Sequence, residues 1–516
     1  MNGSQSAAPW WTDRPLVAAI VVFLAWSLLA LTWPLSGDMG VFGWIADTVH
    51  RGGTPYADAW DTKGPAAWLP SLLVQWIAGR NTWVIRVFDI AMVVAAATAM
   101  RSIARHLGQH GSGRVATMLF LLWYASLDYW SSAQPDGWTG AWLVVATACA
   151  LRGSIAGAAA AGALVGFATM GKPFYLGYLV VTMLAAAATR APFRRHLIRA
   201  AAMLLGMVAV IAALLLFMQL SGALPAYLDV QRWNRDVYAG FGDPWLTRIP
   251  AAIVGVLVVP WGLAAPAAML GVVSLWRTHR LPALALLTAF LGAVAGVMLQ
   301  GKGWTYHWLP MLPFLALLAD AGFAMLRREV AGEIAATFRT LALGLALTVA
   351  ALAPAQRCYR FLRSHLSAEA GETYERREFR YYGRHRGGAY QLVDSLASLE
   401  PQRARIMLWA MHQAPYLHSD LTPPTRFSVI RPLYDGPGSA YRARYRAQFL
   451  DELRADPPRW WLLPTPALLA REAELRDHDL EAFPAAAGFL RERYRLAGQS
   501  EEWQIWERQA GRAEVP

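Results

Sequence analysis

Residues 16–38 read LVAAIVVFLAWSLLALTWPLSGD, an apolar run that ends in a short polar turn. The part from 16 to 33 carries no charge, and as a helix it is long enough to cross the roughly 30 Å of hydrocarbon in a bilayer. A helix satisfies its own backbone hydrogen bonds, as lipid requires. No small-residue cleavage site follows, so we expect a retained membrane helix, not a signal peptide. Asp38, which ends the stretch, then lies just outside the membrane.

The composition extends this prediction to most of the chain. Of the 516 residues, 56% are apolar and only 16% are charged, which is outside the range of soluble globular proteins. The net charge of +12 could suggest nucleic-acid binding. The arginines, however, are spread over short loops and the C-terminal third without forming one basic patch, so membrane topology explains most of them better.

Apolar runs recur up to about residue 355 and predict about eleven membrane-spanning helices. The expected spans are residues 16–33, 81–100, 115–130, 138–151, 154–170, 174–189, 200–220, 250–276, 282–300, 308–326 and 337–355. The run 65–78 is ambiguous because it is short and contains Pro70. Lys and Arg in short loops mark the cytoplasmic side. They fall on one face if residues 65–78 lie in the membrane interface: Arg101, Arg105, Arg114, Arg152, Arg190, Arg194, Arg195, Arg199, Arg277, Arg280, Arg327 and Arg328.

This topology predicts a transmembrane domain over residues 1–355 and a small extracytoplasmic α/β domain over residues 356–516. The first outward loop, 34–80, is expected to contain interfacial helices, because stretches such as 41–49 are amphipathic. In the C-terminal domain, apolar runs at 406–410, 427–430 and 460–463 alternate with helical stretches at 447–454 and 466–475. Its aromatic and basic residues are either a core with a solvated surface, which we favour, or a sugar-binding surface.

The first outward loop contains the residues best suited to catalysis. It begins with Asp38 and continues through Tyr56 to the sequence WDTKGP, which contains Asp61 and Lys63. A lysine beside a carboxylate at the lipid boundary suits an enzyme that holds an anionic headgroup while an acid acts on a second substrate. Two structural roles remain open: Asp38 could cap the helix that follows it, and Lys63 could extend its ammonium group to the interface.

Three further segments on the same face carry candidate residues. Asp136 lies in SSAQPDGW, where a turn is the structural alternative, and Lys172 lies in MGKPFY, a hairpin too short to leave the membrane boundary. The segment LQGKGWTYHWLP places Lys302, Tyr306 and His307 at one depth. An aromatic belt explains its Trp and Tyr residues, but not a lysine and a histidine within reach of a phosphate.

At these residues the chain resembles the GT-C superfamily of membrane glycosyltransferases, in particular the branch with protein O-mannosyltransferases and lipid A aminoarabinose transferases. Those enzymes place an acid in the first outward loop, then surface helices, a lysine followed by prolines, and an Arg-bearing helix. Asp38, Lys63 with Gly64-Pro65, and Arg86 in WVIRVFD match this order, and Lys302, Tyr306 and Pro310 match a late motif. Lys-Gly-Pro replaces Lys-Pro-Pro, and no second acid follows Asp38.

The resemblance implies an inverting transferase that moves a sugar from a polyprenyl-phosphate donor to an acceptor hydroxyl of a glycan, lipid or protein, in a bacterial cytoplasmic membrane. Asp38 would be the general base. Lys63, Lys302, Tyr306, His307 and Arg86 would bind the donor phosphate, and Asp61, Asp136, Lys172 and Tyr56 would contact substrate. No cofactor and no nucleic-acid partner are expected, and the single acid leaves a need for a divalent cation open.

Two other functions fit the same sequence. One is a transporter or flippase of lipid-linked sugars, for which Asp89 and Asp320 inside spans would be the important acids. The other is an oligosaccharide polymerase or ligase, which differs mainly in the size of its donor. The sequence has no P-loop, no HExxH and no cysteine-rich metal spacing, so nucleotide hydrolysis and a structural zinc are not expected.

Overall fold

The computed structural model describes residues 13–108, 113–240, 242–258, 261–329, 333–399, 404–436 and 438–509. Contacts divide the chain into two compact units. The first, here called the helical unit, comprises Met1–Thr32, Arg86–Leu214 and Gly242–Phe361. The second, the mixed unit, comprises Trp33–Ile85, Leu215–Phe241 and Leu362–Pro516. The first outward loop therefore belongs to the same unit as the C-terminal domain.

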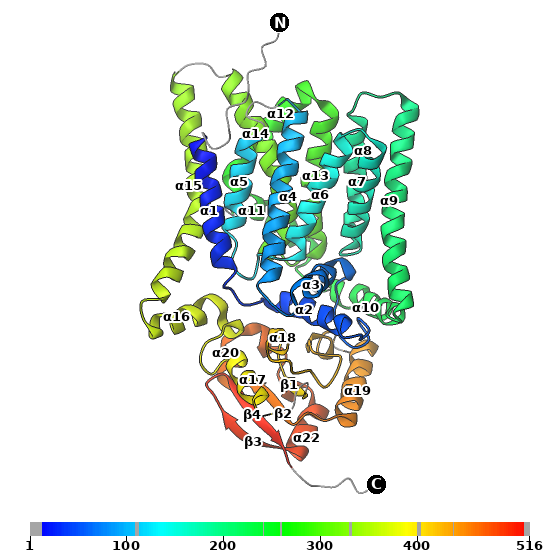
Figure 1. Ribbon diagram of the computed structural model, residues 1–516, viewed down its shortest axis with the longest axis vertical. Helices are drawn as coiled ribbons and strands as arrows, with labels where there is room; N and C mark the ends of the chain where they lie inside the picture. The colour runs from blue at the N-terminus through cyan, green and yellow to red at the C-terminus, as the bar shows by residue number, and fades with distance from the viewer. Residues whose placement is uncertain are drawn as a thin grey trace. The chain divides into compact units, whose positions relative to one another are not determined.

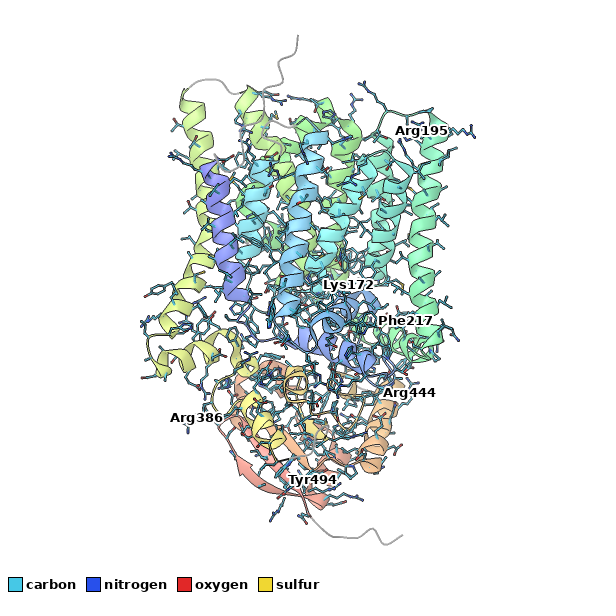
Figure 2. The ribbon with its side chains drawn as sticks, viewed as in Figure 1. Lys172, Arg195, Phe217, Arg386, Arg444 and Tyr494 are labelled. Atoms are coloured by element: carbon cyan, nitrogen blue, oxygen red, sulfur yellow. The ribbon has the colours of Figure 1, made fainter. Side chains whose placement is uncertain are left out.

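The helical unit is built from helices that run side by side (Figure 1). These are α1 (Arg14–Ala30), α4 (Val84–His106), α5 (Arg114–Ala125), α6 (Pro135–Leu151), α7 (Ile155–Thr169), η2 (Pro173–Gly177), α8 (Tyr178–Ala187), α9 (Phe193–Leu220), α11 (Trp245–Val258), η4 (Gly262–Ala264), α12 (Ala265–Thr278), α13 (Arg280–Gln300), η5 (Thr305–Met311), α14 (Leu312–Glu329) and α15 (Glu333–Ser364). Arg195 and Lys172 lie towards opposite ends of this unit (Figure 2).

Several of these helices have the length and composition of membrane spans. Among the described residues, five are long and apolar enough, and a sixth is counted if the bent pair α11 and α12 forms one span. Four shorter apolar helices accompany them. In α9 only 17% of the most apolar window is buried, as expected of a lipid-facing helix, whereas 89% is buried in Thr305–Glu329, a central one. A mainly helical membrane chain is thus confirmed, and the number of eleven spans stays a prediction.

Residues 250–276 were predicted as one span, and the structure differs from this prediction. This segment consists of two helices, α11 and α12, whose axes differ in direction by 82°. Pro266 lies in the first turn of α12, where a proline is well tolerated because the first N–H groups of a helix have no partner within the helix. The same proline could not continue an existing helix, since it lacks the N–H group and its ring would collide with the preceding turn. Hydropathy alone cannot distinguish a bent pair from a straight span.

Helices α12 and α14 pack with their backbones in close contact. A methyl group added at Gly271 would lie 1.8 Å from the carbonyl oxygen of Leu318, and one added at Gly322 would lie 1.8 Å from that of Ala267. Only glycine leaves room for this approach. Small residues at such crossings allow helices to associate in lipid, where the hydrophobic effect supplies no driving force.

The mixed unit combines short helices with one small sheet (Figure 1). Its elements are α2 (Gly37–His50), α3 (Pro65–Ala78), α10 (Leu224–Asp236), η3 (Tyr238–Gly240), α16 (Ala368–Phe379), η6 (Arg380–Tyr382), α17 (Ala389–Ala397), β1 (Ile406–Leu408), α18 (Ala414–Ser419), η7 (Arg431–Leu433), α19 (Ala440–Ala455), β2 (Trp460–Pro464), α20 (Pro466–Arg471), α21 (Ala473–Arg476), η8 (Leu480–Ala482), α22 (Pro484–Arg493), β3 (Tyr494–Gln499) and β4 (Trp503–Arg508).

The sheet has the strand order β1-β2-β4-β3. Strands β1 and β2 are parallel, and the other two pairs are antiparallel. The predicted C-terminal sheet is therefore confirmed, with strands in the runs 406–410 and 460–463, and a separate domain over 356–516 stays a prediction. The run 427–430 is not a strand: Phe427 and Ile430 are fully buried, but the chain turns directly into η7 at Pro432. Proline has no N–H group to donate and rarely lies within a sheet.

The two helices of the first outward loop differ from each other in burial. On α3, Leu73, Trp76 and Ile77 are exposed by 47%, 65% and 76%, as expected of a helix at a membrane interface. On α2, by contrast, every residue from Met39 to Thr48 is buried. Helices α3 and α18 pack against α2 and account for this burial. The expectation that stretch 41–49 lies along the membrane surface stays a prediction.

Candidate active site

Asp38 lies in the first turn of α2. The N-cap of this helix is Ser36, so Asp38 is not the capping residue. Its side chain is partly exposed, whereas its neighbours Gly37 and Met39 are buried. Among the described residues, no hydrogen bond or ion pair engages this carboxylate.

Asp61 and Lys63 form a tight turn in the same unit. The backbone N–H of Lys63 donates a hydrogen bond of 3.2 Å to Oδ2 of Asp61. Burial raises the pKa of Asp61 to about 6, the charge of Lys63 opposes this effect, and the negative charge of Asp38 adds to it. Asp38 belongs to the same compact unit as this turn. The mixed unit thus brings together Asp38, Asp61 and Lys63, which the sequence predicted as neighbours.

The ammonium group of Lys63 lies in a polar and aromatic environment. Its Nζ donates a hydrogen bond of 3.3 Å to Oγ1 of Thr62 and lies 5.9 Å from the ring centre of Tyr238. The guanidinium of Arg431 lies 5.8 Å from the centre of the same ring. Two cations therefore border one tyrosine ring, whose electron-rich face attracts positive charge. The sequence did not indicate Tyr238 or Arg431, because both are far from Lys63 along the chain.

Tyr56 holds the backbone of this turn in place. Its hydroxyl donates a hydrogen bond of 2.9 Å to the carbonyl oxygen of Lys63 and accepts one of 3.0 Å from Nε1 of Trp68. The side chain is fully buried, and its backbone has a left-handed φ of 66°. This conformation is uncommon for a residue other than glycine and persists only where the surroundings determine it. The hydroxyl of Tyr56 is thus directed at Lys63.

Side chains of helix α10 also contact the turn that contains Asp61 and Lys63. The side-chain amides of Gln231 and Asn234 donate hydrogen bonds of 3.3 Å and 3.2 Å to the carbonyl oxygen of Thr62. On the same helix, Trp233 contacts Trp60 edge to face, with ring centres 4.9 Å apart. Side-chain amide and aromatic contacts from α10 therefore fix residues 60–62.

The C-terminal domain contributes directly to this loop. The N–H group of Trp60 donates a hydrogen bond of 3.0 Å to the carbonyl oxygen of Arg426, and Nη1 of Arg426 donates one of 3.3 Å to the carbonyl oxygen of Tyr56. The ring of Tyr445 lies 6.2 Å from that of Trp60. These partners are separated by hundreds of residues, so no local sequence pattern could reveal them.

An ionic cluster joins the first outward loop to α18. Arg80 donates hydrogen bonds of 2.7 Å to both carboxylate oxygens of Asp47 and one of 2.6 Å to Asp420. Arg51 forms ion pairs with the same two acids, at 2.9 Å to Asp47 and 2.8 Å to Asp420. Two arginines and two carboxylates compensate one another, which stabilises a buried charge such as that of Asp47.

Arg86 lies in the helical unit, on α4, and is 1% exposed. Its guanidinium donates hydrogen bonds of 2.7 Å to Oγ of Ser132 and 3.1 Å to the carbonyl oxygen of Tyr129. Asp89, one turn further along the helix, accepts hydrogen bonds from the hydroxyl of Tyr124 at 2.6 Å and from Nε1 of Trp138 at 2.9 Å. The buried charges of α4 are thus held by α5, α6 and the loop between them. The role of Arg86 in donor binding stays a prediction.

Asp136 and Lys172 form a buried ion pair in the helical unit. Nζ of Lys172 lies 2.7 Å from each carboxylate oxygen of Asp136 and 2.6 Å from Oε1 of Gln300, and the hydroxyl of Tyr175 donates a hydrogen bond of 3.1 Å to Asp136. Asp136 is 2% exposed. The cluster joins α6, η2 and α13. Both residues were predicted as site residues from the sequence, whereas their pairing was not, and their contact with substrate stays a prediction.

Lys302 precedes an aromatic cluster in the helical unit. Tyr306 and His307 are 2% and 3% exposed, and their ring centres lie 4.6 Å apart. The ring of Trp304 lies 5.5 Å from Tyr306 and 5.3 Å from His307. Asp38 and Lys63 belong to the mixed unit, so the convergence of these residues on one phosphate stays a prediction. Within the described ranges, no group of three His, Cys, Asp or Glu side chains has the arrangement of a metal site.

Solved structures of similar fold were found, whereas no protein-family model and no curated protein matches the chain. ArnT from Cupriavidus metallidurans, solved bound to undecaprenyl phosphate, has a TM-score of 0.61 at 14% identity over 98% of this chain and 99% of its own. The Archaeoglobus fulgidus oligosaccharyltransferase in its apo form has a TM-score of 0.50 at 12% identity over 99% of this chain and 75% of its own. At these identities the likeness shows the fold alone: the chain shares the fold of these two solved structures, which agrees with the resemblance to the GT-C superfamily seen in its motifs.

Proposed function

We propose that this chain is an inverting membrane glycosyltransferase that moves a sugar from a polyprenyl-phosphate donor to an acceptor hydroxyl on the extracytoplasmic face of a bacterial cytoplasmic membrane. The observation that carries the proposal is the position of Asp38 beside the turn of Asp61 and Lys63. Its carboxylate is partly exposed and accepts no hydrogen bond from the described residues, whereas Asp61 is fixed by the backbone of Lys63. The GT-C fold and the polyprenyl phosphate bound to ArnT support the class of donor.

In the proposed reaction, Asp38 removes the proton of the acceptor hydroxyl as its oxygen attacks the anomeric carbon of the donor. The bond between this carbon and the phosphate oxygen breaks, and its electron pair leaves with the lipid phosphate. Attack from the face opposite the leaving group inverts the anomeric carbon. Lys63 stabilises the negative charge that grows on the phosphate, together with Lys302, Arg86, Tyr306 and His307.

Tyr56 and Asp61 take more specific roles in this proposal. Because the hydroxyl of Tyr56 bonds to the carbonyl oxygen of Lys63, Tyr56 positions the lysine and acts on substrate through it. Asp61 orients the same turn. When its carboxylate is ionised, it attracts the ammonium group of Lys63 and so helps to hold this group in position. Asp136 and Lys172 compensate each other and shape the outer end of the helical unit, where they contact substrate as a pair.

The test compares two acids of one loop. Purified protein is incubated with a panel of polyprenyl-phosphate sugars and candidate acceptors, and release of free lipid phosphate is measured. Asp38→Asn should lower the rate by at least about a hundredfold, the lower range for loss of a general base, and should leave donor binding largely intact. Asp58→Asn is the control, because the exposed side chain of Asp58 accepts a local hydrogen bond of 2.7 Å from the N–H of Thr54 and is not a proposed site residue. Full activity of Asp38→Asn would refute the mechanism.

A further inference from the structure

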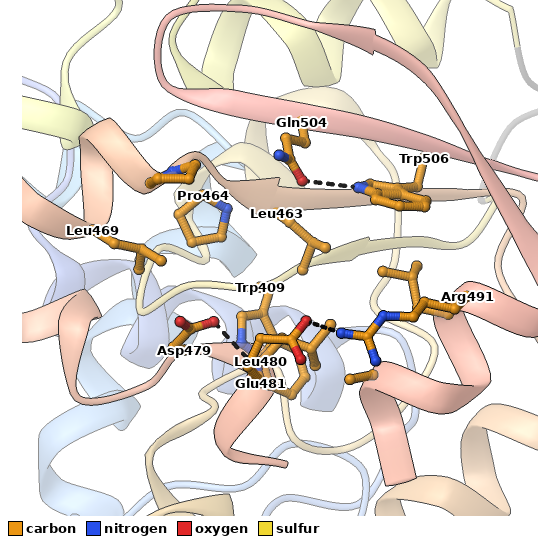
Figure 3. Close-up of a pocket in the computed structure, with 13 residues that line it drawn as sticks. Trp409, Leu463, Pro464, Leu469, Asp479, Leu480, Glu481, Arg491, Gln504 and Trp506 are labelled. Carbon is orange, nitrogen blue, oxygen red and sulfur yellow. Dashed lines mark hydrogen bonds and ion pairs between the residues drawn. The ribbon is translucent and has the colours of Figure 1, made fainter. Parts of the chain in front are cut away.

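The mixed unit contains a cavity of about 210 Å³ on one face of its sheet, and none of the residues discussed above as active-site candidates lines it. Gln504 and Trp506 of β4 form one side, with Leu463 and Pro464 of β2 beside them. Asp479, Glu481 and Arg491 lie across from the strands (Figure 3). Trp409, which is fully buried, also borders the cavity. The space is smaller than the roughly 300 Å³ at which pockets for drug-sized ligands begin, so it suits a single small ring.

The strand side combines an aromatic surface with a polar group. In the register of β2 and β4, Leu463 pairs with Gln504 and Trp461 with Trp506, so both β4 side chains lie on the same face of the sheet. Nε1 of Trp506 donates a hydrogen bond of 3.2 Å to Oε1 of Gln504. This bond orients the amide so that its NH₂ group, which has no protein partner in the described part of the chain, is available to a ligand.

The opposite side supplies an acceptor and a balanced pair of charges. Oδ1 of Asp479 accepts a hydrogen bond of 3.2 Å from the N–H of Glu481, while Oδ2 has no partner among the residues described. Glu481 and Arg491 form an ion pair in which both side chains are mostly exposed. The charges of these two residues cancel, and Asp479 leaves the cavity with a net negative charge. A phosphate group is therefore disfavoured here.

We propose that this cavity binds one uncharged sugar ring. A pyranose or furanose presents C–H groups on its faces, which pack on an indole such as that of Trp506, and hydroxyls at its edge, which both donate and accept hydrogen bonds. The NH₂ group of Gln504 would donate to one hydroxyl and Oδ2 of Asp479 would accept from another. The choice of a sugar over another small polar ring rests on the proposed glycosyl transfer, for which the cavity would hold a sugar of the acceptor glycan.

Binding is tested on the full-length purified chain without donor, so that transfer is not required. Methyl glycosides of glucose, galactose, mannose, arabinose and xylose are titrated, and their dissociation constants are measured by ligand-observed NMR. At least one should bind in the millimolar range or tighter. Trp506→Ala should weaken its binding at least tenfold, and Gln504→Ala about fivefold. Glu507→Gln, next on β4 but facing the other side of the sheet, should change it less than twofold.

Further measurements separate this inference from protein damage and from the transferase proposal. Thermal unfolding of each variant identifies any loss of fold, and Gln504→Ala, a surface change, keeps the test valid if Trp506→Ala unfolds. Asp38→Asn should bind the glycoside as the unmodified chain does, although it fails to transfer sugar. Binding that persists unchanged in Trp506→Ala and Gln504→Ala, or no binding of any glycoside, would overturn the inference even if transfer is observed.

Discussion

The N–H group of Lys63 donates a hydrogen bond to Asp61, a carboxylate that is 7% exposed. Burial raises the pKa of Asp61 to about 6, well above its ordinary value of 3.8. Below pH 6 the folded chain therefore holds Asp61 neutral, and its attraction for the ammonium group of Lys63 is lost. The unfolded chain releases this proton near pH 4, so the folded state loses stability as the pH rises from about 4 to about 6.

The first prediction concerns the pH dependence of transfer. If the ionised Asp61 orients Lys63, kcat/KM should fall about tenfold for each pH unit below 6. Asp61→Asn should have a lower rate at neutral pH and should lack this acidic limb, because it carries no proton to titrate in this range. Rates measured between pH 4.5 and 8 test the prediction, and an unchanged acidic limb in Asp61→Asn would assign it to another group.

The second prediction separates the positioning role of Tyr56 from packing. Tyr56→Phe removes the hydrogen bond to the carbonyl oxygen of Lys63 and the acceptor for Nε1 of Trp68. Loss of a buried hydrogen bond costs about 1 kcal/mol or more, so kcat/KM should drop by at least about fivefold. Tyr227→Phe is the matched control: its ring lies 5.1 Å from that of Tyr56, but its hydroxyl has no hydrogen bond to the described residues. Equal losses in both variants would argue against positioning.

The third prediction concerns the buried pair of Asp136 and Lys172. Lys172→Met leaves the carboxylate of Asp136 buried without its cation, which should destabilise the protein by about 3–5 kcal/mol. The double variant Asp136→Asn with Lys172→Met removes both charges and should recover much of this loss. Thermal unfolding in detergent measures stability. Activity of the stable double variant then shows whether the charges also serve the substrate.

The fourth prediction concerns the ionic cluster between α2, α3 and α18. Arg80→Ala removes three charge-assisted hydrogen bonds to Asp47 and Asp420 and should lower stability by about 1–3 kcal/mol per unsatisfied group. Hydrogen exchange of the α2 amides should increase as well. Arg454→Ala, which breaks an ion pair with Asp451 between exposed side chains, should have almost no effect. Similar exchange in both variants would contradict a supporting role for the cluster.

Local patterns were sufficient to predict much of this molecule. Apolar runs of spanning length indicated the long apolar helices, and the acid and lysine of one loop indicated the candidate site. The C-terminal sheet was also indicated, by short apolar runs such as that beginning at Trp460. All of these signals lie within a few residues of the feature that they predict.

Long-range contacts explain what the sequence did not reveal. Hydropathy could not separate α11 from α12, and nothing near Asp38 indicated that α2 is buried against α18. Arg426 and Arg80 support the first loop through partners more than 300 residues away. The role of each arginine depends on a surface formed by residues far away along the chain. Residue type and spacing alone cannot specify such a surface.

Residues of α10 bind the turn at Thr62, and residues of the C-terminal domain bind Trp60. These contacts have a consequence for engineering. A chimera that exchanged only residues 362–516 for those of a relative would present a foreign surface to Trp60, Tyr56 and Arg80. A viable exchange would need to transplant residues 33–85 and 215–241 with them. Any change of acceptor preference achieved by domain shuffling should therefore require all three segments, and mismatched combinations should lose activity before they lose their membrane helices.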